Sequence, residues 1–282
     1  MAEGVFTHGV ASGDPLTDAV VIWTRVSAGD QPVPASWKLA RDPALSEIVA
    51  EGEVEASPAA DFTVKVDVGG LEPGGVYYYR FEAGGEASEV GRTRTLPGDE
   101  VERLRFAACS CAKFNAGFFN AYARIAERED LDFLLHLGDY IYEASNTPPK
   151  TQTPGADIGR PFEPRDECRT LADYRTRYAQ YHADPDVQAL HLALPIIPTL
   201  DDHELADGAW RGGADNHDPE KHGPWEERKE AAFQARAEWL PTRDPTPETR
   251  AGSSVPSASE GWPTSCCSTS AAAVTSRHWS RR

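Results

Sequence analysis

The chain has 282 residues, a length typical of two domains, and its 40% hydrophobic and 26% charged residues predict a mostly globular protein. No stretch approaches the ~20 consecutive apolar residues of a membrane-spanning helix, so no membrane span is expected. The formal net charge of −17 argues against a nucleic-acid-binding surface, because such a surface needs basic side chains to neutralise phosphates.

Residues 1–98 are predicted to form an all-β domain. The segments 20–26, 62–68 and 76–81 are rich in β-branched and aromatic residues, and turns rich in Gly and Pro separate them. This pattern is typical of a fibronectin III-like or immunoglobulin-like β-sandwich. Because no metal-ligand or nucleophile spacing occurs here, we interpret the segment as a packing or spacer domain, and residues 96–99 (LPGD) as the linker after it.

The pattern changes to α/β from residue 101, and we predict a second domain over residues 101–243. A strand is expected at 104–109, a helix over 118–126, and an apolar strand, buried on both faces, at 131–137. Strand, helix and strand in fewer than 40 residues indicate a βαβ unit.

The next elements are a long loop, two capped helices, a short strand and a last helix. Residues 144–169 are rich in Pro and too long for an ordinary connection, which is typical of lids and binding loops. Helices are predicted to begin after the capping residues Thr170 and Asp184. A short strand is expected at 195–200 and a helix over 225–240.

The C-terminal segment, residues 244–282, is expected to be disordered. It contains no Leu, Ile, Phe or Tyr and is rich in Ser, so it cannot build a core. With GC-rich codons, residues 261–270 encode an apolar strand in a shifted reading frame, which favours a frameshifted tail. The nucleotide sequence of this region would test that expectation.

Three loops that follow predicted strands carry candidate functional residues, because ligands bind at the carboxyl ends of strands in open α/β sheets. The first loop holds Cys109 and Cys111, whose spacing puts both on one face if the strand continues. A thiolate is a soft ligand for iron or zinc, although a free cysteine is also common as a small buried apolar residue. The five cysteines do not form a recognisable disulfide framework.

The second and third loops carry carboxylates. Asp139 follows Gly138 at a strand end and could bridge two metal ions, and Tyr142 could supply a phenolate. The alternative is an aspartate that caps a helix above a packed tyrosine. Asp202 and His203 could supply a metal ligand and a general acid or charge stabiliser, or could belong to a solvated acidic turn.

Six segments in this order, within about residues 5–243, resemble the alkaline phosphatase D (PhoD-like) family. They are 6–15 (FTHGVASGDP), 21–25 (VIWTR), 105–111 (RFAACSC), 136–143 (HLGDYIYE), 171–175 (LADYR) and 199–204 (TLDDHE). The resemblance implies a multi-domain protein in which a fibronectin III/Ig-like β-sandwich precedes a calcineurin-like α/β metallophosphatase domain, with two sheets flanked by helices. It also implies metal-dependent hydrolysis of phosphate monoesters and diesters, with a phosphate ester as the substrate.

By position, the resemblance implies that Cys111 and Tyr142 bind Fe(3+), as thiolate and phenolate, and that Asp139 bridges the metals. Asp202 matches the position that binds Ca(2+), and His203 matches the catalytic histidine that stabilises the phosphoryl transition state.

Members of the resembled family are much longer, so we expect an incomplete metallophosphatase domain and a truncated enzyme. The alternative is an inactive fragment whose only competent part is a β-sandwich interaction module. The family is usually exported, whereas residues 1–8 (MAEGVFTH) show no export signal, so the compartment is left open. The oligomeric state is also left open.

Overall fold

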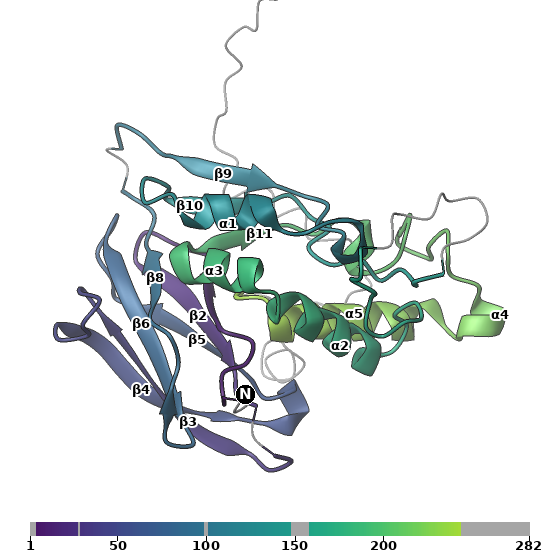
Figure 1. The fold of residues 1–282 in the computed structure, drawn as a ribbon, viewed down its shortest axis with the longest axis horizontal. Helices are drawn as coiled ribbons and strands as arrows, with labels where there is room; N and C mark the ends of the chain where they lie inside the picture. Colours follow the sequence, from purple (N-terminus) through teal and green to yellow (C-terminus); the bar gives the residue numbers. More distant parts are fainter. Residues whose placement is uncertain (1–3, 28, 99–100, 148–157, 244–282) are drawn as a thin grey trace, which may run out of the picture. The chain divides into compact units, whose positions relative to one another are not determined.

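Two β-sheets organise the part of the chain that the computed structural model describes, residues 4–27, 29–98, 101–147 and 158–243 (Figure 1). The first sheet has the strand order β5-β2-β1-β11-β10-β9; the second has the order β4-β3-β6-β7, and β8 also pairs with β6. The strands are β1 (Val10–Gly13), β2 (Ala19–Arg25), β3 (Val33–Ala40), β4 (Ile48–Ala56), β5 (Thr63–Gly69), β6 (Val76–Ala83), β7 (Glu86–Ala87), β8 (Gly91–Arg94), β9 (Phe106–Cys109), β10 (Phe133–His136) and β11 (Ile196–Pro198). The predicted tail, residues 244–282, lies outside the described residues.

The helices begin where the capping residues predict them. The Thr170 hydroxyl accepts a hydrogen bond from the backbone N–H of Asp173 at 3.2 Å, and Asp184 accepts one from the N–H of Asp186 at 2.9 Å. The helical elements are α1 (Asn120–Ala126), α2 (Leu171–His182), α3 (Pro185–Ala193), α4 (Pro219–His222), α5 (Trp225–Trp239) and the 3-10 turns η1 (Pro58–Ala60), η2 (Phe114–Ala116) and η3 (Asp202–Glu204). None of the described helices has the length and apolar composition that crossing a membrane requires.

Residues before the predicted linker form two packed β-layers. Side chains from β2 and β5 in the first sheet share one buried cluster with side chains from β3 and β6 in the second, among them Val20, Ile22, Leu39, Val64 and Tyr79. The predicted β-rich N-terminal region is therefore present, because alternating apolar residues give each sheet one face to bury. The fibronectin III-like or immunoglobulin-like topology stays a prediction.

The first sheet continues across the predicted linker. Strand β1 pairs antiparallel with β2 and parallel with β11, with Gly13 opposite Ile196. A Cβ on Gly13 would lie 2.5 Å from the Pro241 carbonyl oxygen and 2.7 Å from that of Ile196, so only glycine fits this approach. The Trp23 indole N–H donates to the Glu238 carbonyl at 2.8 Å. The predicted division into residues 1–98 and 101–243 stays a prediction, but residues from both segments share one sheet.

The strands β9, β10 and β11 have one well-covered face. Leu134 and Ile196 belong to a buried cluster that also contains Tyr178 of α2 and Leu190 of α3. On the opposite face the burial predicted for residues 131–137 is only partial: Phe133 is buried, but Leu137 is 50% exposed. Phe106 of the neighbouring strand β9 is 44% exposed. Within the described part of the chain, no second layer covers these side chains.

Buried histidines fill the space between the helices and the first sheet. His182 on α2 packs against the rings of Trp23 and Trp239, with centroid distances of 4.6 and 5.4 Å. His191 on α3 exchanges a hydrogen bond with the Tyr140 hydroxyl at 3.1 Å. Burial lowers the pKa of His191 to about 3, with a further contribution from the charge of His136, and burial lowers the pKa of His182 well below 6.5.

We expect the free energy of unfolding to fall as the pH is lowered from 7 to 5. The unfolded histidines bind protons below about pH 6.5, whereas the folded ones stay neutral, so the unfolded state holds more protons. Each such histidine then removes up to ~1.4 kcal/mol per pH unit. Urea unfolding at both pH values should show a smaller pH effect in His191→Gln than in wild type. The control is His222→Gln in α4. This imidazole is only partly buried and its pKa is also lowered by burial, so the pH effect should change less than in His191→Gln. An unchanged pH effect in His191→Gln would contradict this assignment.

Candidate metal centre

Three loops meet at the carboxyl ends of the parallel strands β9, β10 and β11, as the α/β pattern predicts. Backbone hydrogen bonds join the first two loops: Cys111 N–H donates to the Gly138 carbonyl at 3.2 Å, and Ala112 N–H donates to that of Asp139 at 2.9 Å. The Thr199 N–H donates to the His136 carbonyl at 2.8 Å and brings in the third loop. The strand ends therefore hold the candidate residues on a rigid frame.

Gly138 allows the loop after β10 to pass close to the loop after β11. Its φ of +100° lies in the region that disfavours side chains, and a Cβ there would lie 2.8 Å from the backbone nitrogen of Asp201. The turn aims Asp139, which itself has a φ of +54°, toward the third loop. Cys111 in the first loop also has left-handed backbone, with a φ of +57°.

We expect Gly138→Ala to destabilise the protein and weaken metal binding. The positive φ costs about 1–3 kcal/mol, and contact with Asp201 must in addition displace one of the two loops. Thermal unfolding and calorimetric metal titration would measure both effects. Gly70→Ala is the matched control, since its φ of +75° is also positive but nothing lies within 4 Å of the added Cβ. Equal effects of the two substitutions would show that the close approach is unimportant.

Asp139, Asp202 and His203 come together as the candidate metal-binding group. Their possible ligand atoms all lie within 4.8 Å of one another. Asp139 is buried, its Oδ2 accepts the Tyr142 hydroxyl at 2.8 Å, and its Oδ1 accepts the His203 backbone N–H at 3.3 Å. Asp202 Oδ2 accepts the Gly208 N–H at 2.6 Å, which fixes this carboxylate from the other side. The two carboxylates at this spacing suit a cation, and the imidazole of His203 lies beside them.

Tyr142 and Cys111 lie beside Asp139. Burial raises the pKa of the Tyr142 phenol, and its hydrogen bonds with Asp139 and Cys111 raise it further, so the phenol is protonated when it donates to Asp139. The ring of Tyr142 lies 4.1 Å from that of His203, centroid to centroid. The Cys111 thiol is exposed. All five sequence-predicted site residues are therefore at one edge of the sheet, while their individual roles stay predictions.

Cys109 does not share the surroundings of Cys111. Strand β9 ends at Cys109, so the expectation that both thiols lie on one strand face fails where the backbone turns left-handed at Cys111. Cys109 packs against the core near the Tyr122 hydroxyl, and burial raises the pKa of its thiol to about 11. It fits the alternative of a buried apolar cysteine.

Glu143 is a functional residue that the sequence reasoning did not single out. It is fully buried, and its Oε2 lies 2.8 Å from Nδ1 of His203. Burial disfavours the charged form of His203, but the hydrogen bond and charge of Glu143 outweigh it and raise the pKa of His203 to about 9. The other oxygen of Glu143 accepts hydrogen bonds from Asp207 N–H and the Asn216 amide, both at 2.8 Å. The sequence signals for Glu143 were its position next to Tyr142 and its place at the end of segment 136–143.

Glu204 joins the second and third loops. One of its oxygens accepts the Asp201 N–H at 2.8 Å, and the other accepts the Tyr140 N–H. Burial raises the pKa of this carboxyl to about 7. Glu204 thus holds the backbone on both sides of the metal-binding group.

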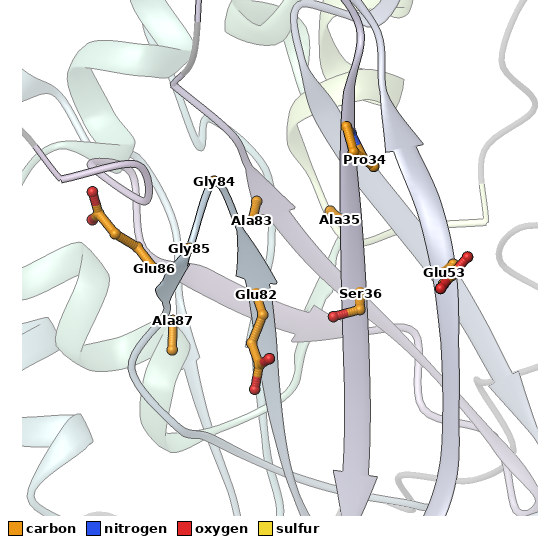
Figure 2. A pocket seen from close by; sticks show the side chains of 10 residues that line it. All are labelled: Pro34, Ala35, Ser36, Glu53, Glu82, Ala83, Gly84, Gly85, Glu86 and Ala87. Carbon is orange, nitrogen blue, oxygen red and sulfur yellow. The ribbon is translucent and has the colours of Figure 1, made fainter.

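A shallow cavity on the second sheet is unrelated to this centre (Figure 2). It is lined by residues of β3, β4, β6 and β7, and its Glu53, Glu82 and Glu86 side chains point in different directions. Glu82 pairs with Arg80 at 2.6 Å, and Glu86 accepts the Val5 N–H at 3.1 Å. The acidic groups therefore do not converge on a ligand.

Comparisons with known proteins find the same family over both the N-terminal β-rich region and the α/β region that carries the three loops. Residues 1–97 match the family model for the PhoD-like phosphatase N-terminal domain, and residues 106–255 match that for the PhoD-like phosphatase. The chain is 41% identical over 251 residues to alkaline phosphatase D of Bacillus subtilis (strain 168), covering 84% of this chain and 41% of that protein. A solved structure of PhoD matches with a TM-score of 0.78 and 38% identity, covering 87% of this chain and 48% of the other. The chain spans less than half the length of both relatives.

Proposed function

The chain belongs to the PhoD-like phosphatase family, and on this basis we propose that it is a metal-dependent phosphoesterase that hydrolyses phosphate monoesters and diesters. The observation that carries the proposal is the convergence of Asp139, Asp202 and His203 at one strand edge, with the Tyr142 hydroxyl on Asp139. The alternative, a β-sandwich interaction module alone, is not favoured, because the family match continues over residues 106–255.

The donor chemistry fits the two proposed metals. The Tyr142 hydroxyl interacts with both Asp139 and Cys111, and Cys111 and Tyr142 would hold Fe(3+) as thiolate and phenolate. Asp202 would hold Ca(2+), which prefers carboxylate oxygens, and Asp139 would bridge the two ions. When bound, such ions polarise a phosphoryl oxygen and lower the pKa of a coordinated water.

His203 is the proposed stabiliser of negative charge on the phosphoryl group. Its Nδ1 hydrogen-bonds to Glu143, which fixes the ring and raises its pKa, and so favours the protonated form. A cationic imidazole held in this way can donate a hydrogen bond to a phosphoryl oxygen without reorganisation. Glu143 acts through His203 and is a positioning residue.

Steady-state hydrolysis of p-nitrophenyl phosphate and its bis ester by the 282-residue chain tests the proposal. We expect turnover with added iron and calcium, loss of turnover with a chelator, and recovery when the metals return. Absence of turnover on both substrates with both metals present would refute the function for this chain. A visible charge-transfer band in the iron-loaded protein that Tyr142→Phe leaves unchanged would refute the role proposed for Tyr142.

A further inference from the structure

Lys113 places a cationic side chain beside the candidate metal centre. It lies two residues after Cys111, and its Nζ is 5.4 Å from the centroid of the Tyr142 ring. The side chain is half-buried. Among the described residues, no carboxylate lies within ion-pair distance of its ammonium group.

The backbone around Lys113 is held at this position from both sides. Its N–H donates to the Cys111 carbonyl at 3.0 Å, and its own carbonyl accepts the N–H of Ala116 at 3.1 Å. The next residue, Phe114, donates its N–H to the Tyr181 hydroxyl at 3.0 Å. The backbone of Lys113 is therefore fixed in the loop whose N–H groups, those of Cys111 and Ala112, donate to the carbonyls of Gly138 and Asp139. The ammonium group at the end of the side chain remains available to a ligand.

The negative charges around the metal centre suggest a role for this ammonium group in binding an anion. Asp139, Asp202 and Glu143 place carboxylates around the site, and the positive charge of His203 is shared with Glu143. A phosphate dianion that approaches such a site needs further positive charge, and a lysine supplies it as a point charge.

We propose that Lys113 binds the non-bridging oxygens of the substrate phosphate and favours monoesters over diesters; this rests on the phosphoesterase function proposed above. A monoester carries two negative charges at alkaline pH and a diester carries one. The same ammonium therefore attracts the monoester more strongly. In this role Lys113 contacts the substrate directly and does not ligate a metal.

A purely structural role, in which Lys113 only packs on Tyr142, makes a different prediction. Lys113→Met keeps an unbranched apolar stem against the ring but removes the charge, and Lys113→Arg keeps the charge. Packing alone would leave phosphate affinity unchanged in both variants. Lys38→Met is the matched control, because it removes a lysine charge from β3 in the second sheet.

The experiment measures inorganic phosphate binding by calorimetry to the full chain loaded with iron and calcium. We expect Lys113→Met to weaken phosphate binding about tenfold, and Lys113→Arg and Lys38→Met to stay within about twofold of wild type. In hydrolysis assays, Lys113→Met should raise KM for p-nitrophenyl phosphate about tenfold and KM for the bis ester by less than about threefold, with a smaller change in kcat.

The outcomes separate this proposal from the proposed function. If wild type binds phosphate in a Lys113-dependent way but turns over neither ester, the phosphoesterase function fails and the phosphate-binding role stands. If Lys113→Met binds phosphate as wild type does, or if wild type binds none, the Lys113 proposal is overturned even where hydrolysis is observed. Equal increases in KM for both esters would overturn the monoester preference.

Discussion

Replacing Asp139 with asparagine is expected to abolish metal binding and to lower phosphoester hydrolysis by more than about 100-fold. Losing a residue that only supports a metal ligand costs up to about 100-fold, and a direct ligand should cost more. The substitution conserves size but removes the charge that two cations would share. It also disturbs the local hydrogen bonds, because both carboxylate oxygens are acceptors, one from Tyr142 and one from the His203 N–H. An asparagine NH2 would face one of these donors with another donor.

Metal content by mass spectrometry and hydrolysis of p-nitrophenyl phosphate would measure the effect of Asp139→Asn. The control is Asp18→Asn, which makes the same chemical change at an exposed position before β2. Asp18→Asn should behave as wild type in both assays. Full metal content and turnover in Asp139→Asn would show that the bridging role is wrong.

Of the substitutions proposed here, Arg177→Leu is expected to lower the free energy of unfolding most. This guanidinium on α2 is fully buried and lies 4.1 Å from the centroid of the Phe162 ring. It donates to carbonyl oxygens of the chain that follows the metal-binding loop, those of Tyr142, Ala144, Glu163, Pro164 and Asp166. Leucine would leave these buried acceptors without their donor.

Loss of a buried charged network of this kind costs about 3–5 kcal/mol, which lowers the thermal midpoint by roughly 6–20 °C in a domain of this size. Calorimetry or circular dichroism would measure the midpoint. Arg124→Leu is the control, because Arg124 is 78% exposed and pairs only with Glu127 of the same helical turn. A decrease in Arg177→Leu no larger than that in Arg124→Leu would contradict the anchoring role.

Local signals made some elements predictable. The strands β2, β5 and β6 follow β-branched and alternating residues, and α2 and α3 follow the caps Thr170 and Asp184. The meeting of Asp139 with Asp202 was also predictable, because parallel strands end at one edge. That inference needs only the positions of the predicted strands along the chain and the assumption that they lie parallel in one sheet.

Other features depend on contacts that no local pattern contains. The pairing of β1 with β11 joins Gly13 to Ile196, far apart in the sequence. Glu143 becomes important through Asn216 and His203, which only the folded chain brings to it. Cys111 adopts a left-handed backbone where its N–H donates to the Gly138 carbonyl, a contact between segments that are far apart in the sequence.

The continuity of the six-stranded sheet also limits how the molecule can move. Since β1 pairs with β11 and Gly13 is packed against the carbonyls of Ile196 and Pro241, separating the N-terminal layers from the strands that carry the metal-binding loops would break this sheet. Substrate access to the centre therefore cannot depend on two lobes opening and closing about the 96–99 linker. The N-terminal layers thereby support β11, the strand that precedes Asp202 and His203.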